Sequence, residues 1–206
     1  MNRVKAKDGK LLYHVTALDN LENIFRNGLL SRNEAIERGL LQKSIANPDI
    51  LEKRDTKNML QYVPFHFFEK TAFTGAVYKA HPETTFCVIT IHRDFAKENN
   101  FKIYTTHPLS TTSDKEPELM NYDEGLAAID WDSLEERNFI KNKKSKNSGM
   151  AECLAPSPVM PSDFQSIYVP TEGIKLKVVE LANKILGNYS FFIDIGAWCT
   201  QEGKND

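Results

Sequence analysis

The sequence predicts an α+β fold in which strands and helices build mixed sheets. Strand-like and helix-like segments follow one another in no regular strand–helix–strand order, which argues against a doubly wound parallel sheet. The sequence also lacks a glycine-rich phosphate loop, so a Rossmann or P-loop fold is disfavoured. With 206 residues, 41% of them hydrophobic, the chain can bury one sizeable core, and we interpret residues 1–206 as a single domain.

The first part of the chain predicts a strand followed by two short helices. Residues 11–16 (LLYHVT) are rich in β formers and predict the strand. Asp19 and Glu22 have the spacing of a capping box, which opens a helix that ends at Gly28. The same spacing begins again at Ser31, so we expect a second short helix there.

Two further segments lead to the centre of the chain. Residues 46–55 (ANPDILEKRD) are polar and predict an irregular or helical connector. Residues 62–68 (YVPFHFF) predict an aromatic strand, and Pro64 places that strand at a sheet edge or beside a bulge, because proline cannot donate a ladder hydrogen bond. An edge strand has free backbone groups, and a ligand beside it is one explanation.

The second half of the chain predicts the centre of the sheet and a long helix. Residues 84–91 (TTFCVITI) are apolar at nearly every position, as expected of a central strand, and residues 101–105 are expected to form a shorter partner. The remaining predicted segments are a capped helix within 126–139, a polar loop at 141–149 (KNKKSKNSG), a strand at 149–156 (GMAECLAP), strands at 165–169 and 189–195, and a helix at 171–186.

Charge and cysteine content limit the possible classes of function. The net charge of −2 argues against wholesale coating of nucleic acid, so any contact with phosphates must come from a local basic patch. Cys87, Cys153 and Cys199 lack CxxC spacing, so we expect no metal site and a reducing, cytoplasmic location. No window approaches the roughly 20 apolar residues of a membrane span. We therefore expect neither a signal peptide nor a transmembrane helix, and no membrane as a partner.

Glu152 is the candidate catalytic centre. It is the one carboxylate in GMAECLAP, between a stretch rich in Lys, Asn and Ser and a proline-rich exit. A solvated surface glutamate is the more common interpretation of such a position taken alone. His14 and Thr16 occupy alternate positions of the first predicted strand, so both side chains point to one face and can bind one ligand together. A structural histidine is the alternative there.

Five short motifs occur in an order that resembles the DarT family. They are YHVT with the following DNL, then NPDILEKR, YVPFHF, AIDW and MAE. Members of that family are toxins of toxin–antitoxin systems that use NAD to attach ADP-ribose to a base of single-stranded DNA. The resemblance implies an ADP-ribosyltransferase-like core, a split sheet with mixed and antiparallel pairing and flanking helices. It also implies NAD as co-substrate, single-stranded DNA as substrate, and an antitoxin partner, of macrodomain type or another kind that removes ADP-ribose.

The same resemblance assigns roles to individual residues. Glu152 corresponds to the catalytic glutamate and Arg54 to the catalytic-site arginine. His107, in YTTHP, stands in place of a TDxH-like segment, and we assign it to the DNA substrate. The residues that the resemblance assigns to NAD binding are His14, Thr16, Asn20, Tyr62 and Phe65.

The identity of the modified base stays open at this point. After YVPFHF the family usually carries a proline-methionine apolar element, whereas this chain reads EKTAFTGAVY. Pocket shape and contacts to neighbouring bases set such a choice. Thymine is favoured over guanine because the pattern that contains Arg54 looks closer to that of thymine-modifying members.

The chemistry of ADP-ribosyl transfer requires these residue types. Breaking the nicotinamide–ribose bond builds positive charge on the ribose, so a carboxylate at Glu152 stabilises the transition state more than the ground state. The planar guanidinium of Arg54 can hold the NAD phosphates or steer the incoming base. A surface arginine in the charged run EKRDTK is the alternative. A base stacked in a duplex cannot reach the ribose carbon, which favours single-stranded DNA.

Two interpretations of the lysine run before Glu152 stay open, and so do two rival functions. The run can follow DNA phosphates beside the active site, or it can be a solvated loop. A transferase that modifies RNA or protein, and a catalytically inactive nucleic-acid-binding module, are the rival functions. The lysines assigned to the DNA substrate are Lys141, Lys143, Lys144 and Lys146.

Overall fold

Two four-stranded sheets organise the computed structural model, which describes residues 4–110, 117–196 and 199. The first sheet has the strand order β1-β3-β7-β8, and its β7–β8 pair is parallel while the others are antiparallel. The second sheet has the order β2-β6-β4-β5 and is antiparallel throughout. The predicted α+β class with mixed and antiparallel sheets is therefore confirmed. The interpretation of residues 1–206 as one domain stays a prediction.

Among the described residues, seven strands lie at expected segments, five of them with at least one shorter end, and β5 was not expected. β2 stops at Phe65, because the chain turns there to bridge to the first sheet, and β8 begins only at Phe192. β2 is an edge strand of the second sheet, as Pro64 predicts. The strands are β1 (Leu11–Ala17), β2 (Tyr62–Phe65), β3 (Phe86–His92), β4 (Lys102–Tyr104), β5 (Leu119–Asn121), β6 (Glu152–Pro156), β7 (Phe164–Val169) and β8 (Phe192–Ile195).

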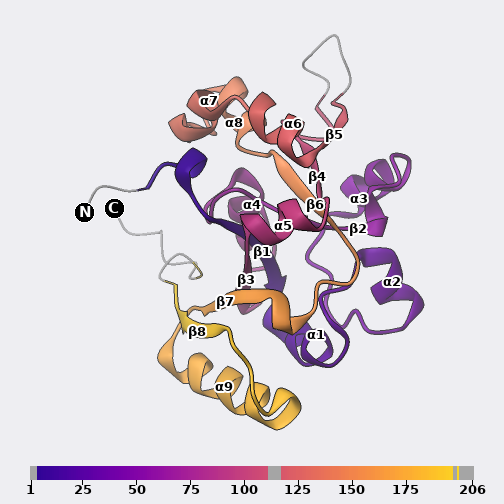
Figure 1. Cartoon of the computed structure of the whole chain (residues 1–206), viewed down its shortest axis with the longest axis vertical. Coiled ribbons are helices and arrows are strands. Elements are labelled where there is room, and N and C mark those ends of the chain that lie inside the picture. Colours follow the sequence, from indigo (N-terminus) through magenta and orange to yellow (C-terminus); the bar gives the residue numbers. More distant parts are fainter. Residues whose placement is uncertain (1–3, 111–116, 197–198, 200–206) are drawn as a thin grey trace.

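Helices cover the ends and flanks of the sheets (Figure 1). α9 lies beside β8 at one end of the molecule, and α6, α7 and α8 gather at the other end. Within the described ranges, no helix is both long enough and apolar enough to cross a membrane. The α-helices are α1 (Leu21–Asn27), α2 (Arg32–Glu37), α3 (Pro48–Asp55), α4 (Ala72–Ala80), α5 (Arg93–Glu98), α6 (Tyr122–Ala128), α7 (Trp131–Glu136), α8 (Lys143–Ser148) and α9 (Glu172–Leu186), and short 3-10 turns are η1 (Ala6–Asp8), η2 (Leu18–Asn20), η3 (Met59–Gln61) and η4 (Pro161–Asp163).

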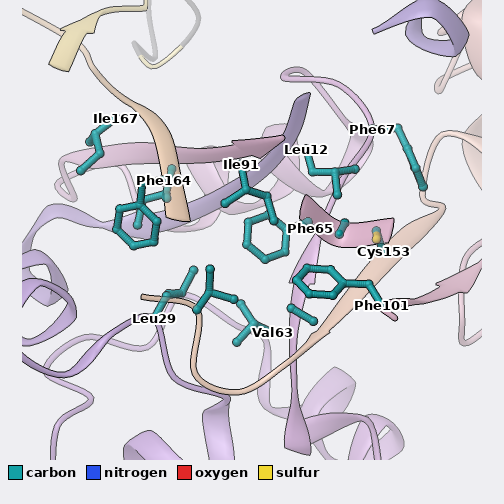
Figure 2. Close-up of a cluster of buried hydrophobic side chains, with 14 of the residues drawn as sticks. Leu12, Leu29, Val63, Phe65, Phe67, Ile91, Phe101, Cys153, Phe164 and Ile167 are labelled. Carbon is teal, nitrogen blue, oxygen red and sulfur yellow. The ribbon is translucent and has the colours of Figure 1, made fainter. Parts of the chain in front are cut away.

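One hydrophobic core contains side chains from both sheets. Leu12 and Ile91 of the first sheet belong to the same buried cluster as Phe65 and Cys153 of the second, and Phe101 lies among them (Figure 2). Each of these side chains is at most 1% exposed. Burying a side chain of this size contributes about 1.5–3 kcal/mol, so the cluster fixes the two sheets against each other. The inner face of β2 and β6 thus belongs to the core, and their other face is left for different contacts.

Three of the predicted local features are wrong: a helix start, a strand pairing and a loop. The capping box at Asp19 does not form: α1 begins at Leu21 after a 3-10 turn, and its N-cap residue Asn20 makes no capping hydrogen bond. The segment expected to pair with the central strand forms β4, which lies in the second sheet between β5 and β6. Sequence patterns predict that a segment is extended but not which strand it joins, because pairing depends on long-range contacts.

The polar segment 141–149, expected to be a loop, contains the helix α8. Asn142 caps this helix, since its side chain accepts hydrogen bonds from the backbone N–H groups of Lys144 and Ser145. Ser145 is fully buried and its hydroxyl accepts a hydrogen bond from the backbone of Asn138. Gly149 packs so close to Phe139 that a Cβ would lie 2.6 Å from the ring. Small side chains therefore let a highly polar sequence pack against its neighbours.

Candidate active site

Glu152 is the first residue of β6, between the edge strand β2 and the strand β4. Side chains alternate along a strand, so Cys153 and Ala155 enter the core while Glu152 and Leu154 face the other side. Tyr104 stands directly opposite Glu152 in the β4–β6 register. The glutamate is only 4% exposed. The solvated-surface interpretation of Glu152 is therefore wrong.

Arg54 holds the Glu152 carboxylate with two parallel hydrogen bonds. Its Nη1 donates to Oε1 at 2.8 Å and its Nη2 donates to Oε2 at 2.9 Å. The arginine comes from the last turn of α3, a helix that begins after the capping residue Asn47 with Pro48 in its first turn. The side chains of Arg54 and Glu152 are 13% and 6% exposed. A bidentate pair of this kind fixes both the position and the orientation of the carboxylate.

Each charge in this pair keeps its partner ionised. Burial alone would raise the pKa of Glu152, but the charge and hydrogen bonds of Arg54, together with the nearby His66 and His107, hold that pKa below its usual value. Burial likewise opposes the charge of Arg54, and the carboxylate outweighs that effect and raises the arginine pKa. Glu152 is thus a buried carboxylate that is ionised at neutral pH.

Two histidines lie beside this pair. His107 was predicted as a DNA contact, and its backbone N–H donates to the carbonyl of Asn147 at 2.9 Å, at the end of α8. Burial lowers its pKa, and the charges of Glu152 and Arg54 act on it in opposite directions. His66 was not predicted as a site residue. The alternation in YVPFHF is the signal that could have found it, because His66 falls on the face of Tyr62 and Pro64 and not on the core face.

His14 belongs to the same neighbourhood. A carbonyl can only accept, so the His14 Nδ1–H donates to the Pro64 carbonyl at 2.8 Å, and the charge of His66 also acts on the His14 ring. Burial lowers the pKa of His14 to about 4. The ring is therefore neutral at pH 7 and carries an acceptor lone pair on Nε2.

The two predicted aromatic contacts differ in exposure. Phe65 is fully buried, and its ring centroid lies 5.6 Å from that of His14. Phe65 therefore packs against the His14 ring, and His14 is itself only partly buried. Tyr62 is partly exposed and packs against the buried cluster of Met59, Tyr104 and Leu154. The assignment of Tyr62 and Phe65 to NAD binding stays a prediction.

Thr16 and Asn20 are buried and hydrogen-bonded to each other. The Asn20 Nδ2 group donates to Thr16 Oγ1 at 3.2 Å and to the Lys43 carbonyl at 2.9 Å. The Asn20 Oδ1 atom accepts from the backbone N–H groups of Gln42 and Lys43 at 3.1 and 2.9 Å. These four bonds use the whole hydrogen-bonding capacity of the Asn20 amide. The amide thereby fixes the chain after α2 against β1, and direct contacts of Thr16 and Asn20 with NAD stay a prediction.

The predicted DNA-binding lysines differ in their contacts. Lys144 forms an ion pair with Asp130, with Nζ 2.7 Å from Oδ2. The charge of Lys146 acts on His107 and lowers the pKa of that histidine. Lys141 and Lys143 are exposed. The assignment of the four lysines to the DNA substrate stays a prediction.

Two other features bear on ligand binding. The described residues contain no group of three or more His, Cys, Asp or Glu side chains that could hold a metal ion. A surface hollow of about 360 Å³ lies between β7, β8 and α9, lined by residues such as Ser166 and Phe192, and none of the predicted site residues borders it.

Comparison with known proteins identifies the family. The family model described as "ssDNA thymidine ADP-ribosyltransferase, DarT" matches residues 13–193. The chain belongs to the DarT family. A curated DNA ADP-ribosyl transferase from Thermus sp. (strain 2.9) is 35% identical to it over 81 residues. That match spans 35% of this chain and only 37% of the length of the relative.

Solved DarT structures share the fold. The Thermus sp. 2.9 DarT in complex with ADP-ribosylated ssDNA superposes with a TM-score of 0.78 at 19% identity, over 96% of this chain and 99% of that one. The same Thermus protein in complex with NAD+ superposes with a TM-score of 0.73 at 18% identity, over 92% of this chain and 96% of that one. Thermosipho africanus DarTG in complex with ADP-ribose gives 0.73 at 18% identity, over 91% of this chain and 50% of that one. The expected DarT-like architecture is confirmed, and the roles of individual site residues stay predictions.

Proposed function

We propose that this protein transfers ADP-ribose from NAD to thymine in single-stranded DNA and releases nicotinamide. The observation that carries the proposal is the buried, ionised Glu152, whose carboxylate accepts two hydrogen bonds from Arg54. This pair occurs in a chain of the DarT family. The family description names single-stranded DNA and thymidine, which supports thymine over guanine as the modified base.

Glu152 acts on the ribose of NAD in this proposal. As the bond between the ribose carbon and nicotinamide breaks, nicotinamide takes the electron pair and positive charge develops on the ribose. A carboxylate that is already ionised and fixed in place stabilises that charge without reorganising at the moment of reaction. A base atom then bonds to the same carbon and loses its proton, so the transfer is a substitution at one centre.

Arg54 serves the reacting end of the site and not the NAD phosphates. Both donors of one edge of its guanidinium are bound to Glu152 in the structure, which keeps the positive charge beside the carboxylate. An incoming base with carbonyl acceptors fits the remaining donors of this planar group. Of the two roles open to this arginine, steering the base is therefore the one that its position supports.

NAD contacts arise from β1 and the edge strand β2. Neutral His14 offers an acceptor at Nε2, and its ring is held by the Pro64 carbonyl and by Phe65. Thr16 and Asn20 shape the wall behind it, and Tyr62 contributes a partly exposed ring. NAD thus acts as a co-substrate. The protein is a cytoplasmic toxin, and its partner is an antitoxin that removes ADP-ribose, of the macrodomain type or another kind.

Two measurements on the full chain test the proposal. Nicotinamide release is followed with NAD alone, with a mixed-sequence single-stranded oligonucleotide, with the matching duplex, with RNA and with protein. We expect release to rise with the single strand, and mass spectrometry to place ADP-ribose on thymine. Modification of guanine, RNA or protein would replace the proposed substrate, and binding of DNA without any nicotinamide release would indicate an inactive binding module.

A further inference from the structure

His66 connects the two sheets directly beside Glu152. It follows the last residue of β2, and its backbone N–H donates to the Tyr13 carbonyl of β1 at 2.8 Å. Its own carbonyl accepts from the Tyr13 N–H at 2.9 Å. These two bonds anchor the backbone of His66 to the first sheet, although its side chain lies with the second.

The His66 side chain reaches the residue that precedes Glu152. Its Nδ1 atom lies 3.3 Å from the Ala151 carbonyl, and because a carbonyl can only accept, Nδ1 carries the proton and donates. The ring packs against Phe73 with centroids 5.5 Å apart, and His66 is 6% exposed. Packing on one side and a hydrogen bond on the other therefore leave the ring a single orientation.

Extended by one residue beyond β2, the β2–β6 register places His66 opposite Glu152. β2 and β6 pair antiparallel with Phe65 opposite Cys153, so the next position of each strand brings residues 66 and 152 together on one face. The charged and titratable groups that act on His66 are Glu152, Arg54 and His107, and it acts in turn on His14. Burial lowers the pKa of His66, so the ring stays neutral at pH 7 and adds no second cation beside Arg54.

We propose that His66 is a positioning residue that fixes the backbone before Glu152 and so aims the carboxylate at the ribose of NAD. This role rests on the proposed ADP-ribosyl transfer. Arg54 holds the carboxylate end of the side chain, and His66 holds the main chain from which that side chain starts. With either anchor lost, the carboxylate moves, and a displacement of about 1 Å can lower a rate about 100-fold.

Three substitutions separate this role from a general packing role. His66→Asn keeps a donor at the position of Nδ1, His66→Gln moves the donor to the position of Nε2, and His66→Phe keeps only a ring. We expect kcat of His66→Asn within about threefold of the wild type, and kcat of the other two lower by about 10- to 100-fold. KM for NAD should change less than about threefold in all three. His92→Asn, at an exposed histidine that bonds to Gln165, is the matched control.

The rescue by asparagine decides the outcome. A residue that only fills space would give Asn and Gln variants of equal activity, so equal loss in both, with intact circular dichroism and melting temperature, would overturn the proposal. Retention of wild-type kcat in the Gln and Phe variants would overturn it as well.

A direct measurement keeps the test independent of activity and of variant folding. In wild-type protein labelled with ¹⁵N-histidine, NMR at pH 7 should show His66 neutral with its proton on Nδ1. A proton on Nε2, or a doubly protonated ring, would overturn the proposal even if every variant unfolds. Absence of nicotinamide release by the wild type would instead refute the proposed function, and the tautomer would still report whether the anchor to Ala151 exists.

Discussion

Two ion pairs of nearly equal length occupy opposite environments in this protein. Arg54 and Glu152 approach to 2.8 Å with side chains 13% and 6% exposed, whereas Lys144 and Asp130 approach to 2.7 Å with side chains 73% and 38% exposed. Water and salt screen the exposed pair, so its charges have little effect beyond their own contact. The buried pair is screened far less, and its charges therefore set the pKa values and the chemistry around it.

The comparison also explains why the lysine run gives a weak functional signal. Lys144 forms an ion pair with Asp130. Asp130 also caps α7, because its side chain accepts hydrogen bonds from the backbone N–H and the hydroxyl of Ser133. The charge of Lys146 instead acts on His107. Position relative to the buried pair, and not the density of positive charge in the sequence, therefore separates a candidate substrate contact from a structural lysine.

The largest expected effect comes from neutralising the buried carboxylate. Glu152→Gln keeps the shape and one acceptor for Arg54, and we expect transfer to fall about 1,000-fold because the stabilising charge is lost. Glu152→Ala should also destabilise the fold by about 3 kcal/mol, since it leaves Arg54 buried without a partner. Initial rates of transfer and urea unfolding measure the two effects.

Asp130→Asn is the matched control for that experiment. It neutralises the acid of the exposed pair and keeps a good N-cap residue for α7. Transfer should equal that of the wild type. A similar loss in both variants would mean that burial does not distinguish the two pairs, and near-normal transfer by Glu152→Gln would remove Glu152 from catalysis.

Arg54→Lys tests whether the guanidinium geometry matters. A lysine keeps the charge but cannot make two parallel bonds to Glu152, so we expect a loss of about 100-fold in transfer, near that of Arg54→Ala. The measurement is kcat for transfer to a single-stranded oligonucleotide. Full activity of the lysine variant would reduce Arg54 to a point charge.

Acid should weaken the buried region before the exposed pair. The pKa of His14 is lowered from 6.5 to about 4 by burial, so the unfolded chain takes up a proton first as the pH falls. Stability should therefore drop between pH 6.5 and 4, by up to about 3 kcal/mol from this group. Asp130 has a pKa lowered from 3.8 to about 2 by Lys144 and by Ser133, so its contribution to stability is lost mainly below pH 4.

Urea unfolding at several pH values measures this difference. His14→Asn keeps a donor for the Pro64 carbonyl but does not titrate, so its stability should fall less steeply between pH 6.5 and 4. Parallel curves for the variant and the wild type would show that His14 is not the buried neutral group that the structure indicates.

The smallest expected effect distinguishes the two lysines. If Lys146 contacts a phosphate of single-stranded DNA, Lys146→Ser should flatten the plot of log affinity against log salt by about 0.7 and raise KM for the oligonucleotide. Lys144→Ser should leave the slope unchanged, because its charge is already paired with Asp130. A slope unchanged from the wild type in both variants would mean that neither lysine contacts DNA.

Much of the fold was predictable from local pattern. The alternation and β formers of 11–16, the apolar run of 84–91 and the capped helix α9 lie where expected, since each depends on neighbouring residues. The helix α8 was missed because the sequence alone does not show that Ser145 and Ser148 would be buried. The partners of β4 were missed because strand pairing is decided between segments far apart in the chain.

The sequence by itself determined the family and the two central candidates, because the order of short motifs is a property of the chain that needs no folding. Tertiary structure alone decided what these residues do to one another. It joined Arg54 to Glu152 across the two sides of the site, turned His66 toward Ala151, and separated Lys144 from Lys146 on one short helix. Such contacts connect distant residues through burial and orientation, and neither follows from spacing along the chain.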